Sequence, residues 1–120
     1  MSMIDTTMTE SLSRFLDVNT VRHQLIVSNL ANIDTPGYRT RDLDFRHELE
    51  RAEGGLEYAS FSPVARQVQG LMERPDGNNV SVERESLLLA ETQLRFQACV
   101  QLLRAEFRRL SLAINDGRQP

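Results

Sequence analysis

The chain has 120 residues, of which 40% are hydrophobic, and its formal net charge is −3. That length allows one domain with one small core. An acidic balance argues against a protein that neutralises nucleic-acid phosphates, so no nucleic-acid partner is expected. No stretch approaches the roughly 18 apolar residues of a membrane span. The N-terminal residues lack a basic start followed by an apolar run, so we expect no cleaved signal peptide.

A long helix is predicted from Thr6 to Ile33. At 3.6 residues per turn, one face collects its large apolar side chains: Met8, Leu12, Phe15, Leu16, Ile26, Leu30 and Ile33. Polar residues interrupt that face near its centre: Asn19, Arg22 and His23. A narrower apolar stripe runs beside it: Val18, Val21 and Leu25. The run Asp34-Thr35-Pro36-Gly37 should end the helix, because Pro36 disfavours a helical Thr35 and Gly37 permits a turn.

The middle of the chain, residues 39–79, is poor helix material and sustains no strand alternation. Short helical or extended pieces are compatible with residues 43–52 and 58–68. We expect a loop-rich, partly disordered segment that becomes ordered on assembly. The segment ends in a helix-entry turn, whose glycine and asparagines tolerate left-handed conformations. This turn consists of Asp76, Gly77, Asn78 and Asn79.

A second long helix is predicted from Ser81 to about Asn115. Ser81 is the expected N-cap, and Glu83 and Glu85 suit the positive end of the helix dipole. Large apolar residues alternate along it at spacings of four and three, and whole heptads extend the row backwards. This seam is suited to packing along another long helix. It consists of Val82, Leu89, Phe96, Val100, Leu103, Phe107, Leu110 and Ile114.

Roughly opposite the seam lies a second apolar stripe: Leu87, Leu94, Ala98, Ala105 and Leu112. One partner helix covers only one of these faces, so a two-helix hairpin leaves apolar surface exposed, as at protein interfaces. The alternative is a third helix, from the middle, that covers it. The predicted fold is mainly α, with two long terminal helices in an antiparallel, coiled-coil-like pair. Its parts are residues 1–38, 39–79 and 80–120 of one helical domain.

No catalytic arrangement is visible in the sequence. His23 and His47 form no metal-ligand pattern with Cys99, the single cysteine, which is interpreted as a small buried hydrophobe. Asp42 and Asp44 alternate along an extended stretch, but the arginines around them indicate a solvated charge cluster rather than acid/base chemistry. Neither a phosphate-binding glycine loop nor a nucleophile turn is present. We therefore predict no enzyme activity, no metal and no cofactor.

Two stretches resemble a known family. Residues 28–38, SNLANIDTPGY, are similar to the SN-x-AN-x-DTPGY signature of flagellar rod, hook and hook-associated proteins. Residues 76–80, DGNNV, the charged residues that follow them, and residues 91–97, ETQLRFQ, resemble the matching region of the proximal rod protein family, FlgB. Residues 39–45, RTRDLDF, are close to that family's continuation of the first stretch.

The resemblance implies a structural subunit of the bacterial flagellar basal-body rod that assembles helically, transmits torque and continues the export channel. Its partners would be other copies of itself, other rod proteins, and membrane-ring and export-gate components at the rod base. Its place would be the periplasmic rod, reached through the flagellar type III apparatus without a cleaved signal peptide. The alternative is a free-standing helical adaptor or a dimeric coiled-coil protein that uses the same apolar faces.

The resemblance also singles out a signature turn as a capping element or an interface. Its two asparagines would bond to free carbonyls at the helix end or to a neighbouring subunit. The proline and glycine would fix a sharp exit from the helix, and the tyrosine would cover the turn. The signature turn consists of Asn29, Asn32, Asp34, Thr35, Pro36, Gly37 and Tyr38.

Overall fold

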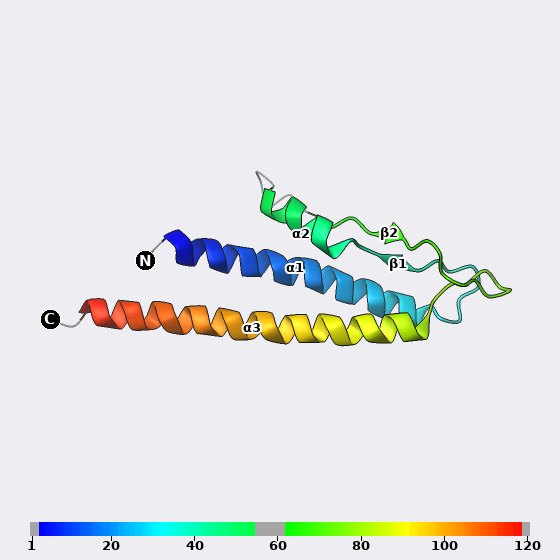
Figure 1. Ribbon diagram of the computed structural model, residues 1–120. Coiled ribbons are helices and arrows are strands. Elements are labelled where there is room, and N and C mark those ends of the chain that lie inside the picture. The colour runs from blue at the N-terminus through cyan, green and yellow to red at the C-terminus, as the bar shows by residue number, and fades with distance from the viewer. Residues whose placement is uncertain (1–2, 55–61, 119–120) are drawn as a thin grey trace.

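The computed structural model describes residues 3–54 and 62–118 of the chain (Figure 1). Its elements, in chain order, are α1 (Met3–Ala31), β1 (Arg41–Asp42), α2 (Phe45–Gly54), β2 (Arg66–Gln67) and α3 (Val82–Arg118). The prediction of a mainly helical fold with a long helix towards each end is confirmed. With 29 and 37 residues, α1 and α3 are about 44 and 56 Å long at 1.5 Å per residue.

Local sequence signals explain where the long helices begin and end. Ser81 caps α3, because its Oγ accepts a hydrogen bond from the Arg84 amide at 3.2 Å, as predicted. α1 ends at Ala31, a few residues before the predicted stop, and turns follow as far as Gly37. Gly37 has a φ of 76°, a conformation that strains any residue with a Cβ. The glycine is therefore required by the exit from α1.

α1 and α3 lie side by side and run in opposite directions (Figure 1). The Asn19 side chain donates to the Thr92 carbonyl at 3.0 Å, and Asn29 donates to the Glu85 carboxylate at 3.1 Å. Residue numbers thus rise along α1 as they fall along α3. α3 is the longer helix, and its C-terminal part extends past the start of α1.

The buried face of α3 follows a seven-residue repeat. Its side chains are at most 9% exposed, and they are Glu85, Thr92, Cys99 and Glu106. Seven residues is the interval at which one helix keeps facing another along their length. Three of the four side chains are polar, so α3 faces α1 through a row that apolar periodicity does not reveal.

The middle of the chain folds back along α1. β1 and β2 form a short antiparallel ribbon that pairs Arg41 with Gln67 and Asp42 with Arg66. α2 begins where the Asp44 carboxylate accepts a hydrogen bond from a backbone amide of the first helical turn, at 3.2 Å. α2 falls where the sequence allowed a short helical or extended piece, at residues 43–52, so residues 45–54 are helical within a segment otherwise expected to be rich in loops. Residues 62–81 have little regular structure apart from β2, and residues 58–61 lie outside the described residues.

α1 lies between α3 on one side and α2 with β1 on the other (Figure 1). This position explains its two apolar stripes. Val18 and Ile26 are almost completely buried, and Phe15 meets Phe45 of α2 edge to face, with the ring centroids 5.1 Å apart. The alternative prediction, a third helix that covers apolar surface of the hairpin, is therefore correct in part. That helix is α2, and the apolar surface that it covers belongs chiefly to α1.

The core is small and rich in polar groups. The buried hydrophobic residues of the described chain are Val18, Ile26, Leu43, Ala52, Val80 and Cys99. The Cα radius of gyration is 18.9 Å, against about 14 Å for a compact domain of this length. An elongated molecule of this kind buries little apolar area. It must obtain its specificity from directed hydrogen bonds and ion pairs.

Candidate functional site

The signature turn and the helix-entry turn pack against each other at one end of the molecule. The Gly37 amide donates to the Asp76 carbonyl at 2.9 Å. Gly77 has a φ of 86°, and a Cβ added there would lie 3.4 Å from the Gly37 Cα. Two turns some forty residues apart in the chain thus form one structure, which we call the junction.

Asn78 is the centre of the junction. Its side-chain Nδ2 donates to the carbonyls of Asn32, Ile33 and Thr35 at 2.9, 3.1 and 2.9 Å, and its Oδ1 accepts from the Val80 amide at 2.8 Å. These three carbonyls belong to the turns that follow α1, which ends at Ala31. One fully buried amide therefore holds the exit from α1 in place and, through Val80, leads into α3.

Asn29 joins three elements and uses its full hydrogen-bonding capacity. Its Nδ2 donates to the Arg41 carbonyl at 2.8 Å and to Glu85 Oε2 at 3.1 Å. Its Oδ1 accepts from the Tyr38 hydroxyl at 2.9 Å and from the Arg41 amide at 3.1 Å. An asparagine offers two donors and two acceptor positions, so all four are occupied. The Asn29 side chain is thus satisfied within the chain, between α1, β1 and α3.

The remaining residues of the signature turn and of the helix-entry turn divide between the inside and the outside of the junction. Asn32 closes a local loop by donating to the Ser28 carbonyl at 2.8 Å and accepting from the Thr35 hydroxyl at 3.0 Å. Asn79 is buried, and its Oδ1 accepts from the Thr40 amide at 2.6 Å. Four consecutive residues are exposed on the outside of the junction: Asp34, Thr35, Pro36 and Gly37.

A network of alternating charges continues from the junction between α1, β1 and α3. The Arg22 guanidinium binds both oxygens of Asp42 at 3.2 Å, and Arg84 bridges Asp42 and Glu85 at 2.7 Å each. Glu85 is fully buried and the Asp42 side chain is 10% exposed. The interpretation of a solvated charge cluster is therefore wrong for Asp42, which is largely buried and paired with arginines of α1 and α3, whereas Asp44 is exposed. The position of Arg22 on the apolar face of α1 was the one sequence signal for a buried partner.

The two apolar rows of α3 have different surroundings. In the predicted seam, Leu89, Val100, Leu103 and Leu110 are half-buried, whereas Val82, Phe96, Phe107 and Ile114 are exposed. The second stripe is exposed along its whole length, with Leu87 at 70% and Leu94 at 67%. Neither α1 nor α2 covers it. This stripe, which we call the outer row, is an apolar surface without a cover in the described part of the chain.

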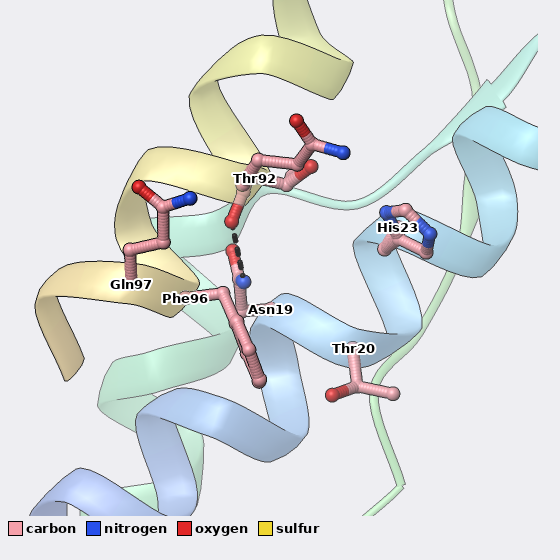
Figure 2. Close-up of a pocket in the computed structure, with 7 residues that line it drawn as sticks. Asn19, Thr20, His23, Thr92, Phe96 and Gln97 are labelled. Atoms are coloured by element: carbon pink, nitrogen blue, oxygen red, sulfur yellow. Dashed lines mark hydrogen bonds between the residues drawn. The ribbon is translucent and has the colours of Figure 1, made fainter. Parts of the chain in front are cut away.

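A groove of about 460 Å³ lies between α1 and α3 (Figure 2). Asn19 reaches into it from α1 towards Thr92, and Phe96 and Gln97 line it from α3. His23 lies at its edge, while His47 is exposed on α2. In the described residues, histidines, cysteines and carboxylates form no group of three that would hold a metal ion. The groove is lined by hydroxyl and amide side chains, by the His23 imidazole and by the Phe96 ring.

Cys99 is buried between α1 and α3, as predicted, with its Sγ 3.5 Å from the Leu12 carbonyl oxygen. Burial raises the pKa of the Cys99 thiol above its usual value. Since the thiolate is the nucleophile, the folded chain should leave this cysteine unreactive near neutral pH.

Alkylation of Cys99 should report whether the isolated chain is folded. We expect iodoacetamide to react at least about tenfold more slowly in buffer than in concentrated urea, because reaction requires α1 to separate from α3. A mass-spectrometric time course measures both rates. Equal rates would mean that α1 and α3 are not packed together in the free chain.

Comparison with other proteins places the chain among flagellar proteins. No helix in the described part of the chain is both long and apolar enough to cross a membrane, and no protein-family model matches the chain. The flagellar basal body rod protein FlgB of Cereibacter sphaeroides is 37% identical over 106 residues, which cover 78% of this chain and 82% of that protein. The FlgB proteins of Bacillus subtilis and Salmonella typhimurium are each 27% identical, covering 91% and 85% of this chain and 94% and 88% of theirs.

An elongated helical chain with a densely hydrogen-bonded polar junction and an uncovered apolar row has the properties of a structural assembly subunit. The comparisons extend over most of its length and agree with one another across distant bacteria. This chain belongs to the FlgB family of flagellar basal body rod proteins. The resemblance carried by the signature turn and by residues 76–97 is thereby confirmed.

Proposed function

We propose that this chain is a structural subunit of the flagellar basal-body rod. It assembles helically with copies of itself and with other rod proteins, links the membrane ring to the distal rod, and continues the export channel. The observation that carries the proposal is the outer row of α3, an apolar surface exposed over the length of the helix in a member of the FlgB family. An exposed apolar row along a helix is typical of a protein interface.

Packing of α1 against α3 as an antiparallel coiled coil is part of the proposal. The seven-residue recurrence of Glu85, Thr92, Cys99 and Glu106 on the side of α3 that faces α1 supports it. That pairing leaves the outer row on one side of α3 and the exposed seam residues on another. Two different surfaces that meet in successive copies form heterologous contacts, which generate helical assemblies when they do not close into a ring.

Torque transmission requires that the two long helices move as one body. The junction supports this role, because Asn78 and Asn29 tie the end of α1 to the start of α3 through buried hydrogen bonds. The Arg22–Asp42–Arg84–Glu85 network adds charge-assisted bonds across the same end. Force applied to one helix is then transferred to the other without a flexible hinge.

The cellular setting completes the proposal. The subunit reaches the periplasmic rod through the flagellar type III apparatus and contacts membrane-ring and export-gate components at the rod base. The outward-facing residues of the signature turn, Asp34 to Gly37, are the part of the junction available for such contacts.

Deletion and restoration of the gene test the proposed function. A strain that lacks it should form no hooks and should not swim, and the intact gene should restore both. Normal hooks and motility in a deletion strain without a second copy would discard the rod function. A closed dimer of the purified chain at micromolar concentration would favour a helical adaptor instead.

A further inference from the structure

The groove between α1 and α3 holds a hydrogen-bond acceptor that the described chain leaves unpaired. Asn19 is 3% exposed, and its Nδ2 is used by the Thr92 carbonyl. Its Oδ1 is buried and has no hydrogen-bond partner among the described residues. A buried unpaired acceptor is costly, so a donor from outside the subunit would stabilise this arrangement. Figure 2 shows Asn19 directed at the α3 side of the groove.

The lining of the groove indicates what kind of donor fits. Thr20, His23, Gln93 and Gln97 surround it, and no carboxylate belongs to the lining. A cation would gain no charge partner there, whereas a neutral amide donates to Asn19 Oδ1 and accepts from a glutamine at the rim. The half-exposed ring of Phe96 offers an apolar wall beside it.

The outer row of α3 carries such an amide in its centre. Leu94, Ala98, Gln101 and Ala105 follow one another at spacings of four, three and four, the pattern of a helix–helix seam. Gln101 is exposed, and on the row it is flanked by the small side chains of two alanines. The same alternation continued in both directions also contains Glu91 and Arg108, so Gln101 is the one neutral polar residue of the row between Leu87 and Leu112. Polar residues in a helix–helix seam fix the register of pairing, since another register leaves them unsatisfied.

We propose that Gln101 of one copy inserts into the groove of a second copy and donates a hydrogen bond to Asn19 Oδ1. This inference rests on the proposed function, because it names the contact by which copies in the rod hold their register. The two surfaces are centred on different sides of α3: Phe96 of the groove is two residues, or about 200° around the helix, from both Leu94 and Ala98, while Gln97 on the groove rim is four residues, or about 40°, from Gln101. One copy therefore offers its outer row to the next and its groove to the one before, which gives an open, heterologous assembly.

Photocrosslinking in assembled basal bodies tests the contact directly. Gln97, on the α3 rim of the groove, is replaced by a photoreactive phenylalanine analogue in cells that lack the native gene, and basal bodies are irradiated after purification. We expect a product with the size of two chains whose crosslinked peptide lies within residues 94–105 of the second copy. A crosslink only to another protein, or none in assembled rods, would overturn the proposal. If the variant does not assemble, the same analogue at the exposed Thr20 on the α1 rim serves instead.

A matched pair of substitutions tests the donor. Gln101→Glu keeps the shape of the side chain but replaces its donor with acceptor oxygens, and Gln24→Glu makes the same change at an exposed position on α1. We expect Gln101→Glu to lower the number of hooks per cell by at least about tenfold, the effect of one lost bond to a buried group. Gln24→Glu should leave it unchanged. Equal hook numbers in the two variants would refute the role of Gln101. The proposed rod function would still stand in that case, provided that the unsubstituted chain restores hooks to the deletion strain.

Discussion

Asn78→Asp should lower the free energy of unfolding of the isolated chain by at least about 3 kcal/mol. The substitution is isosteric, but it exchanges the Nδ2 donor for a carboxylate oxygen. That oxygen would face three backbone carbonyls at the end of α1, from Asn32, Ile33 and Thr35. A buried anion surrounded by acceptors has no favourable partner, so the junction must open or the carboxylate must take up a proton.

Urea denaturation followed by circular dichroism measures the effect. Asn115→Asp is the matched control, since it makes the same change at an exposed position near the C-terminal end of α3. Asn78→Ala should cost less, because the carbonyls keep other donors: the Thr35 amide binds the Asn32 carbonyl at 3.0 Å. Equal stability of Asn78→Asp and the unsubstituted chain would mean that the junction does not hold α1 and α3 together.

Leu94→Asp should abolish hook formation while leaving the isolated chain folded. Leu94 is 67% exposed in the subunit, so its replacement should change the free energy of unfolding by less than about 0.5 kcal/mol. In the rod its side chain would be covered by a neighbour, where an unpaired carboxylate costs several kcal/mol. Phe107→Asp, in the exposed part of the seam, should have the same double result.

Hook counts by electron microscopy and thermal melting of the purified variants separate the two effects. Gln24→Asp, which places the same charge on an exposed position of α1, is the control and should assemble normally. Loss of stability in Leu94→Asp would mean that the outer row is covered within the subunit. Normal hooks with Leu94→Asp would mean that the row is not an assembly surface.

Elements that depend on local sequence were predictable. The N-cap at Ser81, the end of α1 before Pro36, and the turn at Gly77 each follow from a residue's own conformational preference. Asn78 and Asn79 are the exception, because neither is left-handed and both are held by hydrogen bonds across the junction. The exposure of the outer row was also predictable, because α3 carries two apolar faces and one partner helix covers only one of them. These features need no knowledge of what lies across the fold.

The face by which α3 meets α1 was not predictable in the same way. Apolar periodicity placed the seam at Phe96 and Phe107, yet the subunit buries Glu85 and Thr92 instead. These polar side chains are buried because their partners Asn29 and Asn19 arrive from α1, more than fifty residues away. The apolar pattern of one segment carries no information about polar partners elsewhere in the chain. It therefore identified the apolar side chains of α3 that stay exposed more clearly than the contact between α3 and α1.

The sequence left short helical or extended pieces open at residues 43–52 and 58–68, but it could not decide between them or predict the ribbon. Strands of two residues carry no alternation, and α2 has only ten residues. They are held by contacts that local propensity does not report, such as Phe45 on Phe15 and the Arg95 guanidinium 4.5 Å from the centre of the Phe45 ring. The cluster of Asp42 with Arg22 and Arg84 belongs to the same class, since its members come from three elements.

Electron cryomicroscopy of basal bodies purified from the native organism tests the central claim most directly. The account predicts copies of this chain in the rod, with the outer row of α3, from Leu87 to Leu112, buried against a neighbouring subunit and the junction unchanged. Rods that lack the chain, or copies whose Leu87 and Leu94 side chains face solvent, would contradict it.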